Sequence, residues 1–129
     1  MSPATRRMGL PKVATVALAA LTAAAAAADG NAVRGQTLYE ERCSGCHSLD
    51  SHRVGPLHRG VVGRRAGSAP GYEYSPALAR AKIVWDARAL DAWLADPEKL
   101  FPGQRMGYRV ADAADRADLI AYLQRESMR

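Results

Sequence analysis

Apolar side chains recur at helical spacing in two stretches that lie far apart in the sequence. The first stretch runs from Asn31, a residue typical of a helix N-cap, into Cys43. Its apolar positions are Val33, Leu38 and Tyr39. The second begins at about Asp112, with Asp115 three residues further on, and its apolar positions are Leu119, Ile120, Tyr122 and Leu123. The spacing predicts one helix in each stretch.

Glycine and proline interrupt the chain between these two helices. Residues 52–71 are rich in glycine and arginine and are expected to form a long loop. Ser75-Pro76 supplies an N-cap and a first helical residue, and Asp86 is expected to cap another helix that carries Leu90, Trp93 and Leu94 and ends before Pro97. Pro102-Gly103 marks a turn. The pattern predicts an all-α chain with four or five helices, long loops and no sheet.

The first 28 residues have the layout of a secretory signal peptide. Arg6, Arg7 and Lys12 precede an uncharged, alanine-rich run over 13–28, which ends in small residues. The run is shorter than the roughly 20 residues that span a bilayer, and alanine is only weakly hydrophobic, so a permanent membrane anchor is disfavoured. We expect cleavage near Ala28 and one mature domain over residues 29–129.

The net charge of +5 depends largely on this leader. It holds three of the 18 basic residues and none of the 13 acidic ones, which leaves 15 basic and 13 acidic residues in the mature chain. No run of basic residues is interleaved with aromatic residues, so a nucleic-acid partner is not expected. A domain of this size is near the limit at which a chain buries enough apolar surface by itself, and a bound apolar group would add to the core.

Cys43-Ser44-Gly45-Cys46-His47 carries two thiols three residues apart, followed at once by an imidazole. This is the attachment signature of a c-type haem, in which the thiols form thioethers to the porphyrin vinyl groups and the histidine binds the iron from one face. The chain has only two cysteines, so a zinc site would need further ligands from His47, His52 or His58. A disulfide oxidoreductase would need a strand before the motif, where the pattern predicts a helix. Haem is therefore the favoured interpretation, and it also explains the long loops.

A sixth iron ligand can be sought among the four methionines. Met1 and Met8 fall in the leader and Met128 lies at the C-terminus, which leaves Met106 in the loop after Pro102-Gly103. A thioether ligand favours reduced iron, raises the potential and closes the coordination sphere, as electron transfer requires. Ordinary core packing is the competing interpretation for this methionine.

Several further motifs follow the haem signature in order. They are Gly55-Pro56, Gly60-Val61-Val62-Gly63-Arg64-Arg65, Gly71-Tyr72-Glu73-Tyr74-Ser75, Ile83-Val84-Trp85, Leu94-Ala95-Asp96-Pro97, Pro102-Gly103 with Met106, and Arg116-Ala117-Asp118-Leu119-Ile120-Ala121-Tyr122-Leu123. In their order and spacing the chain resembles the class I cytochromes c over nearly all of its mature length. The resemblance implies the cytochrome c fold around one covalent haem c, and a one-electron carrier rather than an enzyme.

The resemblance also implies a role for single residues. Cys43 and Cys46 correspond to the thioether positions, and His47 and Met106 to the two iron ligands. The carbonyl of Pro56 would accept the other imidazole N–H and so fix the ring. The propionate partners would be Arg64, Tyr74 and Trp85. Gly35 and Tyr39 correspond to positions of the first helix that cross the last helix near Leu119 and Tyr122.

Four positions depart from the family pattern. Trp93 stands where a tyrosine often bonds the methionine sulfur, Gln104 replaces a threonine that donates to a propionate, and Leu78 replaces an asparagine. These changes are expected to move the reduction potential rather than the fold. His58 replaces an apolar residue close to the haem. We expect it to pack there or to bond a propionate or a loop carbonyl, with iron ligation as the lesser alternative.

The resemblance implies redox partners and a place outside the cytoplasm. We expect a periplasmic monomer that serves a membrane oxidase, a reductase or a periplasmic dehydrogenase. Basic residues at or near the family's docking positions are Arg42, Arg53, Lys99, Arg105 and Arg109, interrupted by Glu98 and Asp112. A haem peroxidase or a gas-binding haem protein with a labile sixth ligand is the alternative, and a dedicated subunit of one redox complex is another.

Overall fold

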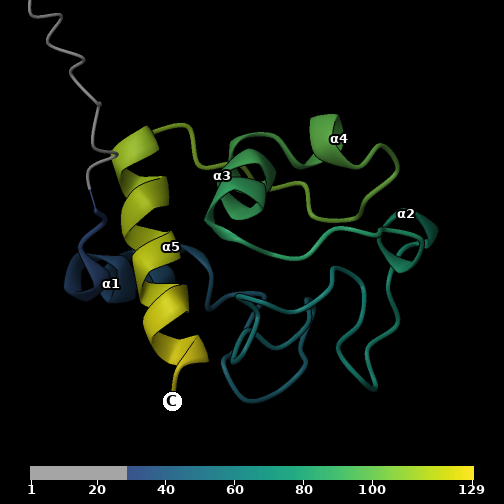
Figure 1. Cartoon of the computed structure of the whole chain (residues 1–129), viewed down its shortest axis with the longest axis horizontal. Coiled ribbons are helices and arrows are strands. Elements are labelled where there is room, and N and C mark those ends of the chain that lie inside the picture. Colours follow the sequence, from purple (N-terminus) through teal and green to yellow (C-terminus); the bar gives the residue numbers. More distant parts are fainter. Residues whose placement is uncertain (1–28) are drawn as a thin grey trace, which may run out of the picture.

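A computed structural model describes residues 29–129, and the leader that we expect over 1–28 lies outside the described residues. The helices are α1 (Ala32–Arg42), α2 (Pro76–Ala79), α3 (Ala87–Ala95), α4 (Pro97–Leu100) and α5 (Ala113–Ser127). Residues 29–129 form no β-strand, and their β-pairing is limited to one isolated bridge between Arg65 and Val84. Figure 1 shows α1 and α5 together at one end and α2 at the other, with long loops between them. The predicted all-α architecture is confirmed.

The helices begin at the residues that the sequence indicates. Asn31 accepts hydrogen bonds from the backbone N–H groups of Val33 and Arg34 at 2.9 and 3.1 Å. Ser75, Asp86 and Asp112 each accept from the backbone N–H three residues later, at 3.3, 2.7 and 2.9 Å. These side chains satisfy N–H groups that have no partner inside the helix, which fixes each starting point.

Asp96 joins α3 to α4, a short helix that the sequence did not predict. It ends α3, and its carboxylate accepts from the N–H of Lys99 at 3.1 Å, so it also caps α4. Pro97 stops α3 because it has no N–H to donate, but it is well suited to the first position of a new helix. The expectation that α3 ends before Pro97 is therefore correct, and α4 follows at once.

Helices α1 and α5 cross at a very short distance. A Cβ at Gly35 would overlap the backbone carbonyl of Asp118, so only glycine fits at this position of α1. The carboxylate of Asp118 accepts from the N–H of Asn31 at 2.6 Å and pairs with Arg34 at 2.5 Å. Asp115 pairs with Arg34 and, at 3.0 Å, with Arg42. The crossing thus combines close backbone packing with ion pairs at its edge.

The long loops are pinned to each other by side chains. Nε2 of His52 lies 2.8 Å from the carbonyl oxygen of Pro70, and its Nδ1 accepts from the N–H of Leu57 at 3.1 Å. The Tyr72 hydroxyl donates to the carbonyl of Val54 at 2.6 Å. These contacts hold residues 52–57 against residues 70–72, so the loops form a fixed wall rather than loose connections.

Candidate haem site

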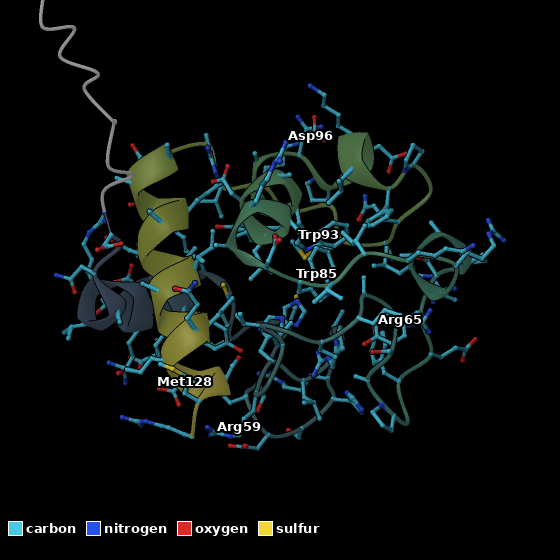
Figure 2. The ribbon with its side chains drawn as sticks, in the orientation of Figure 1. Arg59, Arg65, Trp85, Trp93, Asp96 and Met128 are labelled. Carbon is cyan, nitrogen blue, oxygen red and sulfur yellow. The ribbon has the colours of Figure 1, made fainter. Side chains whose placement is uncertain are left out.

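A cavity of about 590 Å³ lies between the helices and the loops. This volume is in the range typical of cofactor pockets. Its lining is mainly apolar, and no aspartate or glutamate belongs to it among the described residues. Figure 2 shows Trp85 and Trp93 in the middle of the molecule, and both side chains line the cavity. Their rings are 5.5 Å apart between centroids.

One wall of the cavity is the turn that follows α1. The N–H of Cys43 donates to the carbonyl of Tyr39 at 2.9 Å and ends the helix. The N–H groups of Cys46 and His47 both donate back to the carbonyl of Cys43, at 3.0 and 2.9 Å. This tight turn places all three side chains of the motif on the same cavity.

Both cysteines are free thiols. Burial raises the pKa of the Cys43 thiol to about 11, so it is protonated at neutral pH. A thiol that adds across a vinyl group forms a C–S bond and gives its proton to the neighbouring carbon, so two free thiols meet the requirement for two thioether links.

The ring of His47 is fixed by the loop beneath it. Its Nδ1 lies 2.9 Å from the carbonyl oxygen of Pro56, and an N–H there donates to that oxygen. Gly55 packs its backbone on the ring, since a Cβ at this position would overlap the imidazole. Burial lowers the pKa of His47, and the bond to Pro56 opposes this shift. A neutral ring that donates from Nδ1 leaves the Nε2 lone pair for a metal.

His58 lies against the same ring. Its imidazole stacks on that of His47 with centroids 4.0 Å apart and planes inclined by 20°. Its Nδ1 lies 3.0 Å from the hydroxyl of Tyr39. Burial lowers the pKa of His58 well below its usual range, and the neighbouring His47 and Arg64 lower it further. The sequence predicted packing, a propionate or a loop carbonyl for His58, and the Tyr39 hydroxyl was not foreseen as its partner.

Met106 lies on the part of the cavity wall that the C-terminal half of the chain forms. This side chain lies in the loop between α4 and α5, lines the cavity and packs against the buried core. Trp93 lines the same cavity and contacts Phe101, with ring centroids 6.1 Å apart. Met128 is 81% exposed and lies at the end of α5, away from the tryptophans in Figure 2. Of these two methionines, only Met106 lies where it could bind an iron in the cavity.

The three residues expected to hold a propionate all line the cavity. Arg64 donates to the carbonyl of Leu57 at 2.9 Å, which orients its guanidinium. The hydroxyl of Tyr74 accepts from the N–H of Ala69 at 3.1 Å, so its own O–H can be donated elsewhere. Trp85 is 7% exposed. Three donors on a cavity without carboxylates suit a group that carries negative charge.

Gln104 is turned away from this site. Its amide nitrogen donates to Glu98 at 3.0 Å, and its amide oxygen is buried without a hydrogen-bond partner. Its side chain is absent from the cavity lining. Gln104 therefore does not take over the propionate contact of the threonine that it replaces in the family pattern. The two other replaced positions, Leu78 and Trp93, do line the cavity.

The donor set fits a haem c. Two free thiols and a neutral imidazole occupy one wall, a thioether lies on the lining, and the volume and polarity suit a large apolar ring with acidic edges. In residues 29–129 no three histidine, cysteine or acidic residues converge on a possible metal site, which leaves the zinc interpretation without a ligand set there. The motif also follows a helix, not the strand that a disulfide oxidoreductase needs.

Comparisons with known proteins give the same assignment. A family model for cytochrome c matches residues 32–126. Cytochrome c2 of Rhodomicrobium vannielii is 37% identical over 116 residues, which cover 87% of this chain and 92% of that protein. Cytochrome c2 of Rhodopila globiformis is 42% identical over 98 residues, which cover 74% of this chain and 92% of that protein.

The fold has a solved counterpart. Cytochrome cH from Methylobacterium extorquens is similar with a TM-score of 0.71 and 40% sequence identity, over 74% of this chain and 99% of that one. The family match extends from the first residue of α1 nearly to the end of α5 and so includes the whole cavity. The chain therefore belongs to the cytochrome c family, whose members bind one covalent haem c and carry electrons rather than act as enzymes.

Proposed function

We propose that this monohaem cytochrome carries single electrons in the bacterial periplasm, between a membrane oxidase, a reductase or a periplasmic dehydrogenase and the next component of the chain. The leader expected over residues 1–28 supports export. In residues 29–129 no helix has both the length and the hydropathy to cross a bilayer. A haem c, which bacteria attach outside the cytoplasm, agrees with the same compartment.

His47 and Met106 are the proposed iron ligands, and Cys43 and Cys46 the proposed thioether residues. When bound, the haem supplies an iron that gains and loses one electron. The observation that carries the proposal is the bond of His47 to Pro56, which fixes a neutral imidazole beside two free thiols on a cavity that Met106 also lines. With His47 and Met106 both bound to it, the iron would keep no position for a substrate.

The chain contributes rigidity and charge balance. Arg64, Tyr74 and Trp85 are the proposed propionate partners, because a buried carboxylate is costly unless it is paired or hydrogen-bonded. The pinned loops and the apolar lining keep water out and hold both ligand side chains in place in either oxidation state. Little rearrangement then accompanies electron transfer.

The proposed route for the electron is the exposed rim of the cavity. Val54 is 75% exposed and Tyr108 is 44% exposed, and both line the cavity together with Arg42 and Arg105. A redox partner that docks there would come close to the bound group. Because the lining carries two exposed arginines and no carboxylate, the rim suits an acidic partner surface.

Ion pairs reduce the positive field that the sequence predicts around this rim. Arg109 pairs with Asp96 at 3.0 Å and Arg42 with Asp115 at 3.0 Å, whereas Arg53 keeps its full charge because its partner is the neutral carbonyl of Ser44. Arg105 donates only weakly, to the carbonyl of Glu73 at 3.4 Å. We therefore expect electrostatic steering that is present but modest and that depends on Arg53 and, within the cavity lining, on Arg105.

A peroxidase or a gas-binding protein needs an open iron position and a distal acid–base group. The described cavity has His47 and His58 as its histidines, and these two rings stack on each other. His58 therefore lies beside the proposed proximal ligand rather than across from it. Rapid binding of carbon monoxide by the reduced protein at neutral pH would favour this alternative.

Visible and near-infrared spectra of the exported protein test the proposal. We expect c-type bands after reduction and a weak near-infrared band from sulfur to ferric iron. Met106→Ala should lose the weak band and keep the c-type bands, and the matched change Met128→Ala should keep both. The holoprotein should also fractionate with the periplasm. Retention of the weak band in Met106→Ala would overturn the ligand assignment.

A further inference from the structure

Four aromatic rings connect the crossing of α1 and α5 to the proposed iron ligand. Tyr122 on α5 contacts Tyr39 on α1, with ring centroids 5.2 Å apart. Tyr39 meets His58 edge to face at 5.6 Å, and His58 stacks on His47 at 4.0 Å. The sequence positions are far apart, so this row of rings exists only in the folded chain.

Within this row the contact between Tyr39 and His58 is specific. The tyrosine hydroxyl lies 3.0 Å from Nδ1 of the histidine. Tyr39 is 4% exposed, and burial raises the pKa of its hydroxyl above its usual range, so the oxygen keeps its proton. A buried neutral phenol and a partly buried imidazole need each other as partners, since either one alone would lose a hydrogen bond on folding.

We propose that His58 is a positioning residue for His47, and that Tyr39 holds it in place. The bond from His47 to Pro56 restrains one edge of the imidazole, and the backbone of Gly55 packs on the ring. A second flat ring, parallel to within 20° and itself tethered, opposes a tilt of the imidazole. The proposal rests on the proposed role of His47 as the axial ligand.

The consequence concerns the plane of the imidazole about its bond to iron. With a haem bound, this plane would help to set which iron orbital the imidazole overlaps, and with it the spread of the haem methyl shifts in the NMR spectrum of the ferric protein. A role limited to core packing would change stability and leave that spread unaltered. The two roles are therefore separable by one spectrum.

The test compares holoprotein variants by ferric NMR and by thermal unfolding. Tyr39→Phe removes only the hydroxyl, and His58→Leu removes both the hydrogen bond and the stacked ring. Tyr122→Phe is the matched control, because it removes a hydroxyl from the same row of rings but one ring further from His47. We expect a changed methyl pattern in the first two variants and an unchanged one in Tyr122→Phe. The double variant Tyr39→Phe/His58→Leu should give the same methyl pattern as His58→Leu alone, because both changes act through the contact between these two residues.

The outcomes are decisive in both directions. If Tyr39→Phe and His58→Leu lose stability but keep the wild-type methyl pattern, His58 is a packing residue and the inference is wrong. If His58→Leu does not fold, the smaller change Tyr39→Phe decides the matter alone. A wild-type protein without low-spin ferric resonances would overturn the proposed function and this inference with it, so the two failures are distinguishable.

Discussion

Gly55 packs its backbone directly on the imidazole of His47. A Cβ at this glycine would overlap the ring atoms Cε1, Nδ1 and Nε2, while the next residue, Pro56, accepts the ring N–H at 2.9 Å. The dipeptide thus holds the ring both by contact and by a hydrogen bond. A side chain at residue 55 would force the ring or the loop to move.

Gly55→Ala is therefore expected to weaken the site. Displacing a packed ring costs on the order of 1–3 kcal/mol, so the melting temperature and the yield of holoprotein should both fall. The control is Gly45→Ala, because Gly45 lies between the two cysteines of the haem signature and a Cβ there meets nothing within 4 Å. Equal losses in the two variants would show that the close approach at Gly55 is unimportant.

Arg64→Gln is expected to lower the reduction potential. The positive guanidinium disfavours the more positive ferric site, so its removal stabilises the oxidised state. At roughly 10 Å and an effective dielectric constant of about 20 the interaction is about 1–2 kcal/mol, or on the order of 40–80 mV for one electron. Arg65→Gln is the control, because Arg65 is exposed and does not line the cavity. A larger shift in Arg65→Gln would contradict the assigned role of Arg64.

The acid stability of the protein should depend on Asp118. The bond from the N–H of Asn31 and the guanidinium of Arg34 lower the pKa of this carboxylate below its usual value of 3.8. Its contribution is present above that value and is lost as the pH falls through the lowered pKa. Asp118→Asn should therefore lose about 1–2 kcal/mol at neutral pH and approach wild type at strongly acid pH.

Chemical denaturation across this pH range measures the effect. Glu41→Gln, at an exposed position on α1, removes the same charge and should stay close to wild type at every pH. A loss in Asp118→Asn that is the same at acid and neutral pH would show that the carboxylate charge does not stabilise the crossing.

Association with an acidic redox partner should weaken modestly with added salt. Arg105→Gln is expected to slow association a few-fold at low ionic strength, because it removes an exposed charge from the rim. Arg88→Gln, on the surface of α3 and outside the cavity lining, is the control. Stopped-flow kinetics over a series of salt concentrations would measure both. Association rates that do not change with ionic strength would show that the charges of the rim have no role in docking.

Local signals in the sequence predict much of the fold. Each cap depends on a side chain and an N–H two or three residues away, so Asn31, Ser75, Asp86 and Asp112 are readable without the structure. The short helix α4 was not predicted, because a proline that ends one helix can also begin the next. The close crossing at Gly35 came from the family resemblance, since periodicity does not show how near two helices lie.

The site was predictable where its residues form a motif. The spacing of Cys43, Cys46 and His47 is local, and Met106 followed by elimination among four methionines. The partner of His58 was not predictable, because Tyr39 lies 19 residues away and a tyrosine on an apolar helix face looks like core. Such pairs depend on tertiary packing, which leaves no periodic trace in the sequence.

The haem content of the denatured protein tests the central claim most directly. Exported chain, unfolded and separated from unbound pigment, should retain one haem per polypeptide, and replacing both Cys43 and Cys46 by alanine should abolish that retention. A wild-type chain that emerges colourless from a host with an intact maturation system would contradict the account.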